Sequence, residues 1–242
     1  MRFLAIIPSR YASTRFPGKP LQLINGKPML QHVFERVKES GLFERAVVAT
    51  DDMRIEKAVE NFGGDVIMTS LHHQSGTGRC AEAAEKIGGN FEVIINVQGD
   101  EPFIEHTQLK MLCRCFLDNT VKIATLIKKI EKQEELFDSN VVKCVTDISG
   151  KALYFSRSPI PFLRDKPQKE WVYSTDYFKH IGIYGYRIKE LLHLVKLPPN
   201  RLEQAESLEQ LRWLSSGFTI HTALTEIETV AIDTPEDLLK IR

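Results

Sequence analysis

The part of the sequence most suited to chemistry is a loop that carries basic and hydroxyl side chains but no acid. It follows a short apolar run and extends from Pro8 to Pro20, with Arg10, Ser13, Thr14, Arg15 and Lys19 along it. Guanidinium, ammonium and hydroxyl groups can together surround a polyphosphate. Because neither Gly-x-Gly-x-x-Gly nor Gly-x-x-x-x-Gly-Lys-Ser/Thr is present, side chains rather than a glycine-rich backbone would hold the phosphates. A solvated basic surface loop is the alternative interpretation.

Carboxylates that could complement this loop follow another apolar run. Asp100 comes directly after residues 91–97, which are almost continuously apolar. A carboxylate beside phosphates is repulsive unless a cation lies between them, and Mg²⁺ binds carboxylate and phosphate oxygens together. Asp233 is a candidate second metal ligand, although a helix N-cap is the more ordinary role for it.

The elements that must position these residues are predicted from the spacing of apolar residues. Strands are expected over residues 3–7, 46–49, 66–68, 91–97, 121–127, 141–146, 152–155 and 218–224, and helices over 28–41, 51–59, 77–87, 105–117, 202–214 and 235–241. Asp51 is expected to cap the helix that follows it. Alternation of this kind predicts a mostly parallel sheet flanked by helices. Since ligands bind at the carboxyl ends of such strands, Asp100 and the basic loop should share one sheet edge.

Composition excludes several classes of protein. The chain has 242 residues, with 32 Lys plus Arg and 32 Asp plus Glu, and this balance disfavours a non-specific polyanion binder. The neutrality is an average, because residues 1–34 carry five bases and no acid while residues 201–242 carry eight acids and four bases. No apolar run reaches the roughly 18 residues of a membrane span, and no signal peptide is evident, so a cytoplasmic protein is expected. The cysteines lack metal or redox spacing and should be reduced thiols.

Residues 150–185 are rich in aromatic side chains and show no helical period. We interpret them as a β-rich insertion within one domain spanning 1–242, and as an oligomer contact, because aromatic residues are enriched at interfaces. An ordinary core with loops is the alternative.

Three other groups of residues have competing interpretations. Glu203, Glu206 and Glu209 would share one helical face, which is either solvated or used to bind a polyhydroxylated substrate. The adjacent histidines His72 and His73 point apart in any regular element, so a metal or nucleophile role there is disfavoured. His180, taken alone, is more often a structural histidine.

Long ordered blocks of the sequence resemble the 3-deoxy-manno-octulosonate cytidylyltransferases, also called CMP-Kdo synthetases. The blocks are IPSRYASTRFPGKPL at 7–21, QSGT at 74–77, NVQGDEP at 96–102, ALYFSR at 152–157, HIGIYGYR at 180–187, LEQLR at 208–212 and DTPEDL at 233–238. The resemblance implies a Rossmann-like three-layer α/β/α nucleotidyltransferase fold with a small β-rich dimerisation subdomain, and therefore a homodimer. It implies transfer of CMP from CTP to 3-deoxy-D-manno-octulosonate (Kdo), with release of pyrophosphate and use of Mg²⁺, to activate Kdo for lipopolysaccharide synthesis.

The resemblance also assigns roles to individual residues. Its nucleotide-side positions are Ser9, Arg10, Ser13, Arg15, Lys19, Ser75, Gly76, Arg79 and Gln98. Its metal carboxylates are Asp100 and Asp233, which together with Arg15 and Lys19 form the catalytic set. Its sugar-side positions are Arg157, His180, Tyr184, Glu209 and Gln210.

Two departures from the family pattern and two rival functions are noted. Gly78 stands where the family usually has an acid, and Val230-Ala231-Ile232 stands where a glycine is common. The same chemistry on 8-amino-Kdo or another 2-keto sugar acid is one rival. A non-catalytic nucleotide-binding protein is the other.

Overall fold

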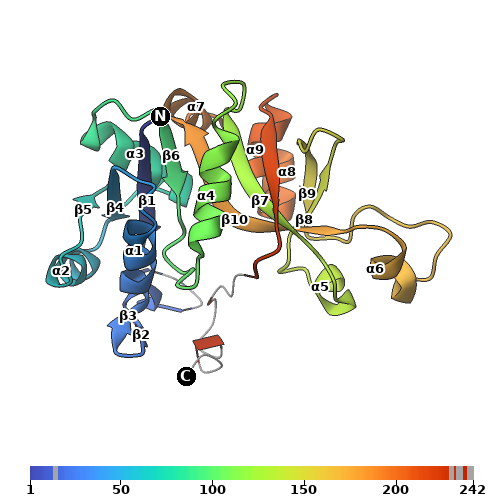
Figure 1. Ribbon diagram of the computed structural model, residues 1–242, viewed down its shortest axis with the longest axis horizontal. Coiled ribbons are helices and arrows are strands. Elements are labelled where there is room, and N and C mark those ends of the chain that lie inside the picture. The colour runs from blue at the N-terminus through green and yellow to red at the C-terminus, as the bar shows by residue number, and fades with distance from the viewer. Residues whose placement is uncertain (13–15, 229–231, 233–236, 239–242) are drawn as a thin grey trace. The chain divides into compact units, whose positions relative to one another are not determined.

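The computed structural model describes residues 1–12, 16–228, 232 and 237–238 (Figure 1). Contacts within the chain divide it into two compact units. The first comprises Met1–Cys113, Ile183–Val195 and Thr229–Arg242, and the second comprises Arg114–Gly182 and Lys196–Glu228. Strand β10 (Phe178–Arg187) contributes its first half to the second unit and its second half to the first. Of the predicted helix over 235–241, only residues 237 and 238 are described.

The first unit is built on a mostly parallel sheet of apolar strands. Its order is β10-β6-β1-β4-β5, parallel except for β10, with β1 at Phe3–Ser9, β4 at Arg45–Thr50, β5 at Val66–Met68 and β6 at Val93–Asn96. The inner strands are buried along almost their whole length, which is expected when helices cover both faces of a sheet. The predicted strands are confirmed, and the carboxyl ends of β1 and β6 lie at one edge.

Helices of the first unit follow the amphipathic stretches. They are α1 (Met29–Glu39), α2 (Met53–Asn61), α3 (Gly76–Ile87), α4 (His106–Cys115) and α7 (Ile188–Leu194), with the short hairpin β2 (Leu23–Ile24) and β3 (Lys27–Pro28) before α1. Helix α1 packs against β1 and β4, and α3 packs against β1, β4 and β6 (Figure 1). The cap of α2 differs from the prediction. Asp52, not Asp51, is its N-cap, because the Asp52 side chain accepts a hydrogen bond from the Arg54 amide.

The second unit holds shorter elements. Its strands are β7 (Ile123–Lys129), β8 (Lys143–Thr146), β9 (Ala152–Ser156) and β11 (Ile220–Thr225), and its helices are α5 (Gln133–Phe137), α6 (Trp171–Ser174), α8 (Arg201–Glu206) and α9 (Gln210–Ser215). Strand β11 runs parallel to β7, while β8 pairs antiparallel with both β9 and β10.

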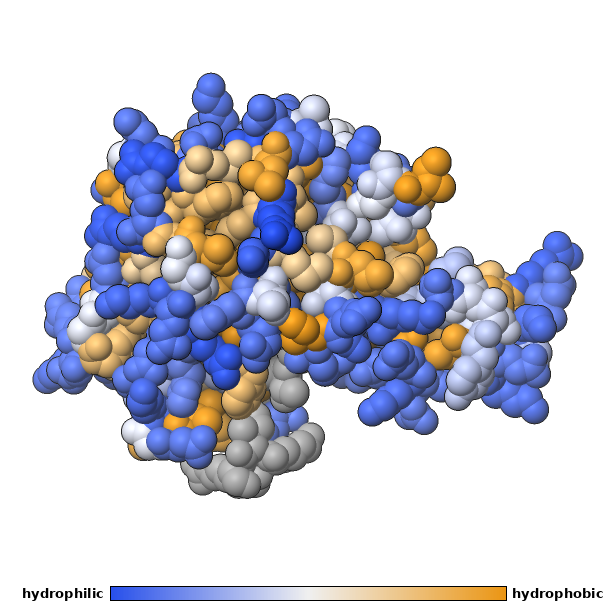
Figure 2. Space-filling model, viewed as in Figure 1, coloured by the Kyte–Doolittle hydropathy of each residue, from blue (hydrophilic) through white to orange (hydrophobic). Residues whose placement is uncertain are grey.

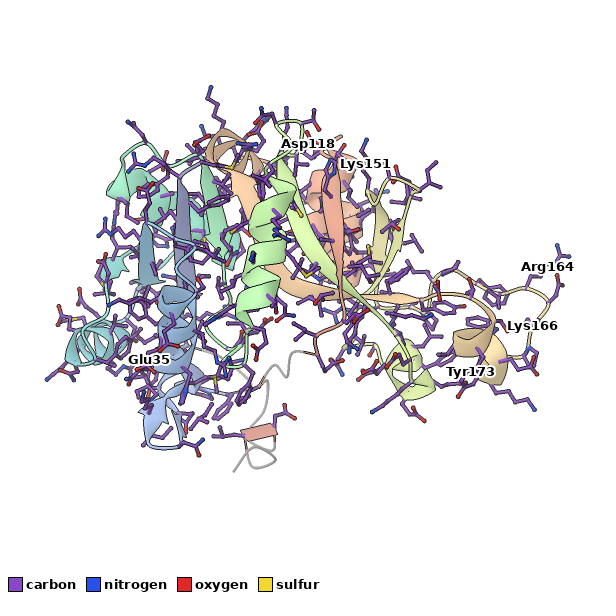
Figure 3. All side chains as sticks on the ribbon, viewed as in Figure 1. Glu35, Asp118, Lys151, Arg164, Lys166 and Tyr173 are labelled. Atoms are coloured by element: carbon purple, nitrogen blue, oxygen red, sulfur yellow. The ribbon has the colours of Figure 1, made fainter. Side chains whose placement is uncertain are left out.

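The predicted β-rich insertion is β-structured only at its two ends. Between β9 and β10, residues 157–177 contain no strand but a 3-10 turn (Gln168–Glu170) and α6. Trp171 and Tyr177 are buried there, and their rings stack with centroids 6.3 Å apart. They share an apolar cluster with Ile130 and Leu136. Arg164, Lys166 and Tyr173 lie on the outside of this segment (Figure 3). Its aromatic residues therefore fill a small local core as well as an exposed surface.

The single helix predicted over 202–214 is wrong. The chain forms α8 and α9 instead, separated at Ser207, which adopts a left-handed conformation with φ 53°. The predicted common face of acids does not form. Glu203 and Glu209 both contact Arg212, with Arg212 Nη2 at 3.0 Å and 3.1 Å from their carboxylates, while Glu206 points to the end of β9. An αL residue interrupts helical periodicity without a signal in the apolar pattern.

Among the described residues, no helix is both long enough and apolar enough to cross a membrane. The face of the molecule in Figure 2 is hydrophilic around its margins and carries an apolar area over its upper middle.

Candidate active site

A pocket of about 230 Å³ opens at the carboxyl ends of β1 and β6 in the first unit. Its lining is assembled from three loops that follow β1, β5 and β6. Eight of the predicted nucleotide or metal residues line it, namely Ser9, Arg10, Lys19, Ser75, Gly76, Arg79, Gln98 and Asp100. Ser13, Arg15 and Asp233 lie outside the described residues. The sheet topology has therefore brought together residues that lie up to 91 positions apart, as the parallel pattern predicted.

The basic loop is held in place by its backbone and by one apolar anchor. Gly18 adopts φ 69° and its amide donates to the Tyr11 carbonyl at 3.0 Å, so the loop folds back on itself before the 3-10 turn Lys19–Leu21. Glycine is favoured at this φ because it has no Cβ. Phe16 is buried in a cluster with Ile24, Met29, Ile232 and Leu238. The turn and the anchor together aim Lys19 into the pocket.

Lys19 and Asp100 form the closest charge pair in the pocket lining. Lys19 Nζ lies 2.6 Å from Asp100 Oδ2, and the two side chains are 13% and 32% exposed. The carboxylate thus already lies beside a positive group, at the end of a buried strand. A carboxylate that lines the pocket fits a magnesium ligand. Mg²⁺ binds one or two carboxylates and keeps water and phosphate oxygens in its other coordination positions.

The chain just before Asp233 lies next to Asp100. The Ile232 amide donates to the main-chain oxygen of Asp100 at 3.3 Å, and the Ile232 side chain is fully buried. Ile232, the residue before Asp233 in the sequence, therefore lies at the end of β6, beside Asp100.

The start of α3 forms another wall of the pocket. Ser75 is its N-cap and accepts a hydrogen bond from the Gly78 amide at 3.2 Å. The first amides of a helix point outward and favour a bound anion. An added Cβ at Gly78 would lie 3.0 Å from His73 Nδ1, so His73 leaves little room for a side chain there.

His73 lines the pocket, although its sequence context gave it no role. Its Nε2 contacts the carboxylate of Glu82, which also accepts hydrogen bonds from the Ser70 amide and pairs with Lys86. Burial acts to raise the pKa of Glu82, but the bonds from Lys86, Ser70 and His73 outweigh it and lower the pKa to about 2. Glu82 is thus ionised and orients the imidazole. The position of His73 two residues before Ser75, at the start of a helix, is the signal that could have identified it.

Arg79 lines the pocket, but its guanidinium is bonded to other residues of the fold. It is 4% exposed, with Nη2 2.7 Å from Asp51 Oδ2 and Nη1 2.6 Å from Thr69 Oγ1. Asp51, predicted as a helix cap, is therefore the counter-ion of Arg79. The buried pair fixes the amino end of α3 to the ends of β4 and β5.

Four of the five predicted sugar-side residues, Arg157, His180, Glu209 and Gln210, lie in the second unit, and Tyr184 lies in the first. His180 Nε2 is 3.0 Å from Thr125 Oγ1, and its ring packs edge-on against Phe155 at 5.2 Å. Burial lowers the pKa of His180 to about 3, so the imidazole is neutral near pH 7 and can exchange hydrogen bonds but not bind as a cation.

The other residues predicted on the sugar side are held by well-defined contacts. Arg157 donates to the carbonyls of Ser139 and Glu206 at 2.9 Å and 2.7 Å. Glu209 binds Arg212, and Gln210 is 6% exposed. Tyr184 is 7% exposed and stacks on Tyr186 with ring centroids 5.8 Å apart. Glu206, expected only on one acidic face with Glu203 and Glu209, contacts Arg157 of this set.

Comparison with known proteins decides the family. The family model described as Cytidylyltransferase matches residues 4–226. The chain is 52% identical to the 3-deoxy-manno-octulosonate cytidylyltransferase of Parabacteroides distasonis, over 99% of this chain and 96% of that protein. It is 54% identical to the protein of the same name from Cytophaga hutchinsonii, over 98% of this chain and 95% of that protein. The chain belongs to the 3-deoxy-manno-octulosonate cytidylyltransferase family.

A solved structure of a member of this family supports the fold. The structure of CMP:2-keto-3-deoxy-manno-octonic acid synthetase complexed with CTP superposes with a TM-score of 0.92 at 42% identity, covering 100% of this chain and 97% of that one. The family resemblance and the mixed α/β fold with a mostly parallel sheet are thus confirmed.

Proposed function

We propose that the protein transfers CMP from CTP to Kdo, giving CMP-Kdo and pyrophosphate. The observation that carries the proposal is the pocket at the ends of β1 and β6, which gathers Lys19, Asp100 and the start of α3 in a chain about half identical to curated family members. A basic group, a carboxylate and a helix amino end are together suited to a nucleoside triphosphate.

The pocket residues account for the electrostatic part of the reaction. The anomeric hydroxyl of Kdo attacks the α-phosphorus of CTP, a new P–O bond forms, and the bond to the β-phosphate oxygen breaks with departure of pyrophosphate. Negative charge grows on the leaving group, and Lys19 and Arg10 supply compensating positive charge beside it. Arg15 is proposed to join them. The Ser75-capped amides of α3 add fixed dipoles that need no reorganisation during the reaction.

We propose Asp100 and Asp233 as the residues that hold Mg²⁺. The support is the oxygen donor of Asp100 in the pocket and the hydrogen bond of its main chain to Ile232, the residue before Asp233. When bound, the ion would polarise phosphate and hydroxyl oxygens and lower the hydroxyl pKa. Asp100 and Lys19 orient one another at 2.6 Å, which keeps the carboxylate aimed at the phosphate side of the pocket.

Pyrophosphate release by the purified full chain tests the function. CTP, Mg²⁺ and Kdo should give release, and the other nucleoside triphosphates should give much less. Assays with 8-amino-Kdo and with Kdo distinguish the two sugar acids. Faster pyrophosphate release with 8-amino-Kdo would identify it, rather than Kdo, as the substrate. Binding of CTP without release with any sugar acid would favour the non-catalytic alternative.

We further propose a homodimer in the cytoplasm. Phe162 and Tyr173 on the segment between β9 and β10 are 72% and 83% exposed, and aromatic side chains are enriched at protein interfaces. All four cysteines are thiols, which fits a reducing compartment. Light scattering after gel filtration should give twice the 27.7 kDa chain mass, and Phe162→Ser with Tyr173→Ser should shift it toward the monomer.

A further inference from the structure

Glu206, at the last position of α8, makes a three-point contact with the end of β9. Its Oε1 accepts a hydrogen bond from Ser156 Oγ at 2.6 Å and its Oε2 accepts one from the Arg157 amide at 2.9 Å. Its main-chain oxygen accepts a third from Arg157 Nε at 2.7 Å. One residue thus fixes both the backbone and the guanidinium of Arg157.

The break between α8 and α9 makes this contact possible. Ser207 is in the left-handed region, and only its amide continues the helix by donating to Glu203. The last carbonyls of a helix have no intrahelical partner. The carbonyl of Glu206 is therefore available to Arg157, which it would not be inside the continuous helix that the apolar pattern predicts.

A second support holds the opposite side of the guanidinium. Arg157 Nη1 donates to the Ser139 carbonyl at 2.9 Å. The loop that carries Ser139 is fixed by Lys143, which is fully buried and donates to the carbonyls of Asp138 and Val141 at 2.8 Å and 2.6 Å. The guanidinium is thus braced from two separate segments of the second unit.

Neither support neutralises the charge of Arg157. Both groups that contact the guanidinium are carbonyls, and in the part of the chain that the structure describes no carboxylate forms an ion pair with it. Glu206 directs its carboxylate to a hydroxyl and an amide instead. Arg157 keeps its charge in a fixed orientation, and no hydrogen bond among the described residues uses its Nη2, which suits the oxygen of an anionic carboxylate.

We propose that Glu206 is a positioning residue for the carboxylate of the sugar acid, acting through Arg157. The inference rests on the proposed function and adds to it a residue that specifies an acidic sugar. Removing Glu206 leaves Arg157 charged but able to adopt other rotamers, so recognition of the sugar carboxylate weakens while the CTP pocket of the first unit is unchanged.

Steady-state kinetics on the full chain test this role. Glu206→Ala should raise KM for Kdo about tenfold or more and leave KM for CTP within about twofold. Arg157→Ala should raise KM for Kdo at least as much, and the double variant should add little to it, because the two residues act as a unit. Ser156→Ala removes only one of the three contacts and should give a smaller rise. Gln204→Ala, an exposed change on the same helix, is the matched control and should behave as wild type.

A sugar in which an amide replaces the carboxylate provides a readout that a purely structural role would not change. The wild-type preference for Kdo over this amide should shrink in Glu206→Ala and partly return in Glu206→Gln, which keeps one acceptor oxygen. Equal changes in KM for CTP and Kdo, fully additive effects of the two single variants, or an unchanged preference would overturn the inference. If the wild type does not turn over Kdo, both the proposed function and this inference are wrong. If it does, and Glu206→Ala leaves KM for Kdo unchanged, the inference alone fails.

Discussion

The ammonium of Lys19 lies 2.6 Å from the carboxylate of Asp100, so the residue proposed for phosphate and the residue proposed for the metal are direct neighbours. The pair is 13% and 32% exposed, and it joins the loop after β1 to the loop after β6. The proposed binding of Mg²⁺ at Asp100 would therefore take place beside an existing ion pair.

Asp100→Asn should abolish turnover and leave the fold intact. The amide is nearly the same size, and a partly exposed ion pair contributes only about 1 kcal/mol to stability, so thermal unfolding should change little. Pyrophosphate release should fall by roughly a thousandfold, as when a group that stabilises developing charge is removed. Near-normal release at saturating Mg²⁺ would contradict the metal assignment.

Lys19→Met should act mainly on the nucleotide. The methionine keeps the stem and removes the positive charge beside the leaving group, so kcat/KM for CTP should fall by at least about a hundredfold. Initial rates at varied CTP and fixed Kdo provide the measurement. Lys27→Met is the control, because Lys27 is basic and close in sequence but pairs with the surface residue Glu35. An unchanged CTP dependence in Lys19→Met would exclude the phosphate role.

Gly99→Ala should disturb the pocket by a steric route. A Cβ at this position would lie 2.5 Å from Ser9 Oγ and 3.2 Å from the Pro8 carbonyl, so the loops after β1 and β6 must separate. Overpacking of this kind costs about 1–3 kcal/mol, and Asp100 would move with its loop. We expect kcat/KM for CTP to fall at least about tenfold. The double variant Ser9→Ala/Gly99→Ala removes the nearest atom and should regain stability in urea unfolding; failure to regain any would point to another cause.

Asp51→Asn should destabilise the fold because Arg79 would keep its charge in a buried site. Breaking a buried pair by removing one partner costs about 3–5 kcal/mol. The matched control is Asp65→Asn, which breaks the exposed Arg45–Asp65 pair, with side chains 42% and 39% exposed, and should cost less than about 1 kcal/mol. Urea unfolding of both variants gives the comparison. Equal losses would show that burial of Arg79 does not set the cost.

The neutral state of His180 predicts a loss of stability in acid. Its pKa is lowered to about 3 in the fold, whereas a histidine in an unfolded chain titrates near pH 6.5. Between these values the unfolded chain binds a proton that the folded chain does not, so the unfolding free energy falls as pH falls from about 6.5 toward 3, by at most about 1.4 kcal/mol per pH unit. Above about pH 7.5 this contribution is complete.

His180→Gln isolates that effect. Glutamine can still bond to Thr125 but does not titrate, so the variant should lose less stability than the wild type between pH 7.5 and pH 5. His221, whose pKa is also lowered by burial, is present in both proteins and cancels in the difference. Parallel stability curves for the two proteins would contradict the prediction.

The strands and the pocket could be predicted because their signals are local. Apolar runs such as residues 3–7 and 91–97 become β1 and β6, and parallel pairing then places Lys19 and Asp100 at one edge without further information. The family blocks supplied the other pocket residues, so that eight predicted residues line the pocket in all, Lys19 and Asp100 included.

What the sequence did not reveal depends on backbone conformation and on distant partners. Ser207, a left-handed residue, interrupts the apolar spacing of residues 202–214, and only in three dimensions does Glu206 meet Arg157 rather than its neighbouring acids. Asp51 and Asp52 are chemically alike. Asp51 pairs with Arg79, 28 residues further along the chain, and Asp52 is left to cap the helix.

The first unit is discontinuous in the chain, and this sets the order in which it can form during synthesis. Residues 1–113 emerge from the ribosome first, but their sheet ends on Ile183–Arg187 of β10, and their apolar cluster includes Ile232 and Leu238. Domains usually fold as they emerge, amino end first. Here the loop that bears Lys19 is anchored through Phe16 on Ile232 and Leu238, so its packing is completed only after those later residues have been translated.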